Sequence, residues 1–225
     1  MRILSVLLVA LWPAWALAQD EAPRIIVTAT GSASAVPDMA TVSLGVEREA
    51  VTASQAMDEV AAAANAVMEK IQAAGIETRD VQTSSLNLNP VWDQGNGRPR
   101  IRGYSASTML TVRVRDLDML GGLLDSVVSE GANTLNGLSF GFGDAAPLET
   151  AARSDAVAKA RQKAETLATA AGVTLGPVQT ISEGDIGGGP VPMFRTMAME
   201  AAPMPVAEGE LDVRVSVTVV FAIGG

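Results

Sequence analysis

Two segments of the chain repeat one another at a constant separation, and this repeat constrains the fold more than any other feature. Residues 170–173 (Ala-Ala-Gly-Val) and 178–180 (Val-Gln-Thr) match residues 73–76 (Ala-Ala-Gly-Ile) and 81–83 (Val-Gln-Thr). Both blocks are offset by 97 residues, since 170 minus 73 and 178 minus 81 give the same value. A shared offset across a helix end, a turn and a strand start indicates a duplicated structural unit.

The first copy has the order strand, helix, strand, strand. Apolar and polar residues alternate over 41–46, as in a half-buried strand. A capping box predicts that a helix begins at Thr52, and the helix is expected to end at Gly75, because glycine adopts the left-handed conformation without steric cost. The segments 81–92 and 100–114 then read as the two strands of a hairpin.

The second copy repeats this order with a strand over 138–142, a helix over 148–171 and strands over 178–182 and 213–223. Its hairpin loop, residues 184–210, is much longer and lacks a clear period. The helix carries an inner stripe of small residues, which predicts that its packing partner approaches closely. The stripe consists of Leu148, Ala152, Ala156, Ala160, Ala164, Leu167 and Ala171.

These patterns predict an α+β fold, in which antiparallel sheets pack on helices. The first unit spans residues 24–116 and begins with an edge strand. A connecting helix spans 117–132, and the second unit spans 133–225 with the long loop 184–210. The two units could equally pack together as one domain.

The N-terminal residues 1–18 are typical of a signal peptide. Arg2 supplies a positive charge, an apolar run follows, and an A-x-A cleavage motif ends at Ala18, so the mature chain is expected to begin at Gln19. The apolar run contains Pro13 and is shorter than the roughly 20 residues of a membrane-spanning helix. Cleavage and release into the periplasm are therefore favoured over membrane anchoring, and no later stretch is apolar enough to be a transmembrane segment.

The composition excludes several kinds of chemistry. The chain has no histidine and no cysteine, so the usual nucleophilic triads, zinc sites and redox pairs are unavailable. Asp116 and Asp118 could form an acid–base pair, but they precede a predicted helix, and helix capping is the favoured interpretation. The formal net charge of −9 makes nucleic acid a poor partner. We therefore expect a non-enzymatic protein without a cofactor.

Several short motifs follow one another in order along nearly all of the chain after residue 18. They are Gly31, Pro37-Asp38-Met39-Ala40, Gly103-Tyr104-Ser105-Ala106-Ser107, Val112-Arg113-Val114-Arg115-Asp116-Leu117, Gly131-Ala132-Asn133, Phe140, Ala152-Arg153-Ser154-Asp155-Ala156-Val157, Lys163-Ala164, Leu167-Ala168, Gly172 and Leu175-Gly176-Pro177-Val178. In this order they resemble the SIMPL-domain family of exported bacterial proteins. The resemblance implies a periplasmic or cell-surface location and an association with oxidative-stress defence. It supplies no catalytic residues to transfer.

One cluster of aromatic and basic residues lies on the first predicted hairpin. Trp92 and Tyr104 accompany Arg98, Arg100 and Arg102. Such a cluster could contact carboxylates or phosphates of a partner, or a neighbouring subunit. The favoured alternative is an exposed hairpin kept soluble by arginine, with the tryptophan packed beneath it. Open sheet edges predict a homo-oligomer, and a cell-envelope protein is a further candidate partner.

A second cluster consists of four methionines in the long loop 184–210, namely Met193, Met197, Met199 and Met204. Thioethers are ligands for Cu(I), so a Cu(I) site is one hypothesis. Exposed methionines are also oxidised reversibly, so oxidant scavenging is another. The favoured alternative is that methionine serves here as adaptable filler in a loosely packed loop.

Overall fold

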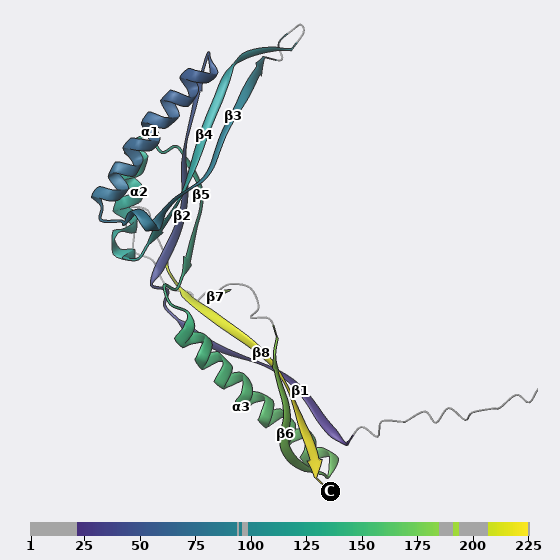
Figure 1. The fold of residues 1–225 in the computed structure, drawn as a ribbon. Helices are drawn as coiled ribbons and strands as arrows, with labels where there is room; N and C mark the ends of the chain where they lie inside the picture. The colour runs from purple at the N-terminus through teal and green to yellow at the C-terminus, as the bar shows by residue number, and fades with distance from the viewer. Residues whose placement is uncertain (1–21, 94, 96–98, 185–190, 194–206, 225) are drawn as a thin grey trace, which may run out of the picture.

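The computed structural model describes residues 22–93, 95, 99–184, 191–193 and 207–224. Two antiparallel sheets lie end to end along an elongated molecule, and the helices cover one side of them (Figure 1). The predicted α+β class is confirmed. Among the described residues, no helix combines the length and the hydrophobicity that crossing a bilayer requires.

The first sheet is built from the middle of the chain and is covered by two helices. Its strands, in spatial order, are β3 (Val81–Asp93), β4 (Arg100–Val114), β2 (Met39–Ala50) and β5 (Thr134–Gly141). The helices are α1 (Ala53–Ala73) and α2 (Leu120–Ser129), with single 3-10 turns at Thr78–Asp80 and Leu117–Met119. Leu44 from β2, Leu110 from β4 and Ile71 from α1 are almost completely buried between sheet and helices.

The second sheet joins strands from both ends of the described chain. Its order is β1 (Arg24–Ala35), β8 (Glu210–Gly224) and β6 (Thr174–Glu183), and a short β7 (Val191–Met193) pairs with the start of β8. One helix, α3 (Ala146–Ala171), packs across β1 and β8. The alternating apolar residues of β8 face this helix, as a strand with one covered face requires.

The alanine stripe of α3 is confirmed over most of its length, with a correction at its end. Ala152, Ala156, Ala160 and Ala164 are fully buried against β1 and β8, whereas Leu148, the first predicted residue of the stripe, is half-buried. Leu167 is 46% exposed and Ala171 is also exposed, whereas Ala168 is buried. The buried residues follow a strict four-residue spacing, because residues four apart lie nearly above one another on a helix. The sequence analysis placed Leu167 and Ala171 after Ala164 in the buried stripe. This was wrong, because Ala168 continues the stripe instead.

The two sheets do not coincide with the predicted contiguous units 24–116 and 133–225. β1 pairs along its whole length with β8 and so belongs with the second unit, while β5 pairs with β2 of the first. The last strand of each copy, β4 or β8, lies inside its sheet. β4 has β2 as one neighbour, and β8 has β1 in the corresponding position. Alternation along a strand identifies its covered face but not its neighbour, so the local pattern could not show this exchange.

The repeat itself is visible in the backbone. Gly75 after α1 has φ 88° and Gly172 after α3 has φ 69°, so both helices end at a left-handed glycine. Each helix then leads into an antiparallel hairpin, β3–β4 in one copy and β6–β8 in the other. Within the long segment 184–210, residues 191–193 form β7, which pairs with the part of β8 that extends past β6.

Candidate interaction surface

The β3–β4 hairpin reaches past the helices (Figure 1). Apolar side chains near its end are exposed to solvent. Trp92 pairs with Ile101 on the neighbouring strand, next to a register shift between Val91 and Trp92. The side chains of Trp92 and Ile101 are 52% and 46% exposed. The sequence favoured a tryptophan packed beneath the hairpin. This interpretation was wrong, because the Trp92 side chain is exposed.

The basic residues of the hairpin lie beside carboxylates of the same chain. Arg100 pairs with Asp93 at 3.7 Å, and Arg102 pairs with Glu49 at 3.0 Å, in both cases with exposed side chains. Exposed pairs of this kind contribute at most about 1 kcal/mol, so a binding partner can replace them at little cost. Arg98, the third predicted arginine, lies outside the described residues.

Tyr104 has a different role from its neighbours in the predicted cluster. It is half-buried and packs with Ala56, Val60 and Ala106 beneath α1, so it forms part of the core. The preceding Gly103 explains why β4 can follow β2 so closely here, because a Cβ at this position would lie 2.6 Å from the carbonyl oxygen of Ala50.

The sequence did not single out the outer edge of β3, which continues the apolar surface. Leu86 and Leu88 are opposite Thr108 and Ala106 and therefore share the helix-covered face, yet both are exposed. α1 lies over β2 and β4 and barely reaches β3, so this strand remains uncovered. Within the described part of the chain, β3 has a strand neighbour on one side alone. A signal was present, since two leucines alternate with asparagines in a segment with few charges.

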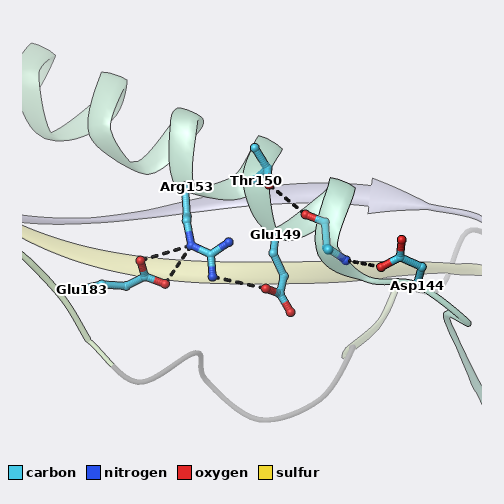
Figure 2. A network of polar contacts seen from close by, with 6 residues as sticks. Asp144, Glu149, Thr150, Arg153 and Glu183 are labelled. Carbon is cyan, nitrogen blue, oxygen red and sulfur yellow. Dashed lines mark hydrogen bonds and ion pairs between the residues drawn. The ribbon is translucent and has the colours of Figure 1, made fainter.

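A polar network ties the end of β6 to α3, close to where the chain enters the methionine-containing segment (Figure 2). Arg153 donates from Nε to both carboxylate oxygens of Glu183, at 3.0 and 3.1 Å, and from Nη2 to Glu149 at 3.2 Å. The hydrogen bonds with Glu183 chiefly raise the pKa of Arg153 above its ordinary value. Asp144, which precedes the N-cap residue Ala145, accepts a hydrogen bond from the backbone N–H of Ala146, the first residue of α3. The network holds the strand end in place.

Other charged groups with shifted pKa values are likewise held by neighbours. Arg115 makes two hydrogen bonds to the buried Asp80, at 2.9 and 2.8 Å, which lower the pKa of that carboxyl. Ser34 and Arg214 lower the pKa of the buried Asp212 in the same way. These pairs link β4 to the turn before β3, and β1 to β8.

The remaining predicted residues are placed as follows. Asp116 accepts a hydrogen bond from the backbone N–H of Asp118 at 3.1 Å, so the capping interpretation is confirmed. The backbone of Met193 lies in β7 opposite Glu210. Met197, Met199 and Met204 lie outside the described residues, so the Cu(I) and oxidation hypotheses stay predictions.

Comparison with known proteins identifies relatives that match most of the chain. A family model described as "SIMPL: Protein of unknown function (DUF541)" matches residues 25–221. The "26 kDa periplasmic immunogenic protein" of Brucella melitensis is 42% identical over 214 residues, which cover 89% of this chain and 84% of the relative. The "Uncharacterized protein YggE" of Escherichia coli K12 is 31% identical over 188 residues, which cover 84% of this chain and 76% of the relative.

Proposed function

Because the chain belongs to the SIMPL (DUF541) family, we propose that it is an exported, non-enzymatic periplasmic protein that binds other protein chains, first of all copies of itself. The observation that carries the proposal is the apolar surface on the open edge of β3, formed by Leu86, Leu88, Trp92 and Ile101. Support for the location comes from the predicted signal peptide and from the printed name of the Brucella relative.

The edge of β3 has the properties of a strand that accepts a partner. Monomeric proteins usually protect such edges with lysines, prolines, bulges or short strands. β3 runs for 13 residues and contains no lysine, and its one charged residue is Asp93 at the end. Pro90 interrupts the hydrogen-bonding pattern near the hairpin tip, and a register shift lies between Thr83 and Ser85. Residues 85–89 are therefore the part best suited to pair with another strand.

A second copy of the chain can meet this locally basic hairpin with its own carboxylates. Arg100 and Arg102 would then exchange their exposed pairs with Asp93 and Glu49 for pairs across the contact. The formal net charge of −9 opposes the approach of two copies, so the apolar surface has to supply the attraction. Antiparallel pairing of two β3 strands about a two-fold axis would be a closed arrangement, which limits assembly to a defined size at this contact.

Sedimentation velocity at micromolar concentration tests the proposal. The wild-type chain should sediment faster than its 23.2 kDa monomer, or the slightly smaller cleaved form. Leu88→Lys should weaken association by at least about tenfold, because it places a charge on the edge strand. Val157→Lys is the matched control, since Val157 is 41% exposed, against 43% for Leu88, and lies on α3 instead of a sheet edge. A wild-type chain that is monomeric at all concentrations would contradict self-association.

A second candidate function uses the four methionines of residues 184–210. Methionine sulfur reacts with peroxide or hypochlorite to give sulfoxide, which cellular reductases restore. This scavenging role requires accessible sulfur atoms and no fixed geometry, so it demands less of the sequence than a Cu(I) site does. It is also compatible with the association of the family with oxidative-stress defence that the resemblance implies.

A further inference from the structure

A small apolar cavity lies between α2 and the first residues of β5. Its volume is about 180 Å³, and Leu44 from β2, Leu124 and Val127 from α2, and Leu135 from β5 contribute to its walls. Leu44, Leu124 and Val127 are buried, whereas Leu135 and the neighbouring Val128 are 56% and 61% exposed. Val128 and Leu135 line the cavity and are also exposed to solvent. They therefore form an apolar rim at its opening.

An irregularity in strand pairing lies beside this cavity. β5 pairs with β2 through Ser43–Gly137 and then Leu44–Leu135, so Asn136 is left without a partner in the register. A bulge of this kind bends its strand and turns the adjacent side chains to new directions. Here it places Leu135 and Leu44 at the same level of the sheet, next to the C-terminal half of α2. Bulges are over-represented at sheet edges, such as β5, and next to active sites.

The chemistry of the lining restricts what can enter the cavity. Its polar residues are Asn133 and Thr134, and no charged side chain lines it. The side chain of Asn133 accepts a hydrogen bond from the N–H of Glu47 at 2.9 Å and donates one to the carbonyl of Glu47 at 3.0 Å. The side-chain amide of Asn133 thus makes the same pair of hydrogen bonds to Glu47 that a backbone segment of a neighbouring strand would make. A polar or charged ligand would lose its hydration without gaining a strong partner in return.

We propose that this cavity binds a neutral apolar molecule, such as a small aromatic hydrocarbon or a short aliphatic chain. An enclosed apolar cavity of about 150 Å³ binds benzene. This cavity has a similar volume and an apolar lining but opens to solvent at its rim, so it has room for a molecule of about the size of benzene or toluene. The rim of Val128 and Leu135 provides the entry. This binding does not depend on self-association, because the cavity lies next to β5 and the proposed pairing edge is β3, at opposite sides of the same sheet.

Toluene is a suitable probe, and methyl NMR spectra of the full chain are a direct readout. Titration should shift the methyl signals of Leu44, Leu124 and Val127 in a saturable way and leave those of Val215 in the other sheet unchanged. Bound toluene should also raise the melting temperature with increasing concentration, since a ligand of the folded state stabilises it.

Two variants test the location of the site. Val128→Trp should obstruct the rim and weaken toluene binding by at least about tenfold, and it should fold normally because Val128 is exposed. Ala132→Leu should fill the cavity from the buried side, and its melting curve shows whether it folds. Val157→Trp, at an exposed position on α3, is the matched control and should bind as the wild type does.

Loss of binding in Val128→Trp, or in a folded Ala132→Leu, with retention in the control supports the proposal. The absence of saturable methyl shifts in the wild type overturns it. Unchanged affinity in both folded variants does so as well, because toluene would then bind elsewhere.

Discussion

Gly31 in β1 lies directly against the backbone of Ala156 in α3. A Cβ atom at position 31 would lie 2.8 Å from the Cα of Ala156 and would overlap the carbonyl oxygen of Ala152. Hydrogen bonds hold the two elements at this distance, since Asp155 accepts from the N–H of Ser32 at 2.9 Å. The close packing of β1 on α3 therefore requires both the glycine in the strand and the small alanine side chains of the helix.

Replacement of Gly31 by alanine should destabilise the protein. The added methyl group can be accommodated if α3 moves away from β1, and the overpacking should lower the free energy of unfolding by about 2–4 kcal/mol. Urea denaturation monitored by circular dichroism measures the change. Gly137→Ala in β5 is the control, because no atom lies within 4 Å of a Cβ there, and its effect should stay within about 0.5 kcal/mol. Equal effects of the two substitutions would contradict the close contact.

The buried stripe of α3 should reject larger side chains. Ala160 is completely buried, and Ala160→Leu should lower the free energy of unfolding by about 1–3 kcal/mol through overpacking. Ala158→Leu, two residues away on the exposed side of the same helix, should have little effect. The comparison of the two melting curves tests the orientation of the helix, and an unchanged curve for Ala160→Leu would show that the stripe is not packed.

The Asp80–Arg115 pair should make stability depend on pH in the acid range. The hydrogen bonds from Arg115 lower the pKa of Asp80 in the folded protein below its ordinary value of 3.8. The contribution of the ionised Asp80 to the free energy of unfolding is therefore fully present above pH 3.8. It is lost as the pH falls through the lower pKa that Asp80 has in the folded protein. The stability difference between wild type and Asp80→Asn should be constant from about pH 7 to pH 5 and should shrink below about pH 4.

Denaturation at a series of pH values measures this difference. Asp125→Asn is the control, because Asp125 is an exposed residue of α2. A stability difference for Asp80→Asn that stays constant down to pH 2 would show that the pair does not shift the titration.

Oxidation should distinguish the methionines of residues 184–210 from those of α1. Dilute hydrogen peroxide on the folded protein, followed by peptide mass spectrometry, should find sulfoxide at Met193, Met197, Met199 and Met204 first. Met57 and Met68 should react more slowly, since both are partly buried and pack against the core clusters. Equal rates at all six positions would refute the scavenging hypothesis. Oxidation of urea-unfolded protein supplies the reference rates.

Export should be accompanied by cleavage after Ala18. N-terminal sequencing of the protein from a periplasmic fraction is expected to begin at Gln19, because small residues occupy positions 16 and 18. Ala18→Leu is expected to slow this cleavage and leave a longer form in the membrane fraction. A mature protein that keeps Met1 would contradict the prediction.

The local parts of the fold were predictable from the sequence, because local chemistry determines them. Thr52 caps α1 as the capping box indicates, and Gly75 and Gly172 end their helices in the left-handed conformation. The hairpins of both copies follow from their alternating apolar residues. The neighbours of β1 and β5 were not predictable in this way, because strand exchange changes which edges meet and leaves the alternation of each strand unaltered.

The exposure of the hairpin residues was predictable in part, whereas their role in binding stays a prediction. Trp92, Arg100 and Arg102 are exposed on the hairpin, but Tyr104 points into the core. All four residues have the same local setting in the sequence, and only the position of α1 over the sheet separates them. The exposed leucines of β3 were missed for the same reason, since the width of the helix layer decides whether a strand residue is covered.

The pairing of β1 with β8 also has a consequence for the order in which the chain can fold. All strands of the first sheet lie between residues 39 and 141, so that sheet can close while the remaining chain is still being made. β1 is made earlier but needs β8, whose residue Ala222 lies opposite Arg24. At about 5–20 residues per second, synthesis of the intervening chain takes roughly 10–40 s. Throughout that time β1 lacks the strand with which it pairs in the folded protein.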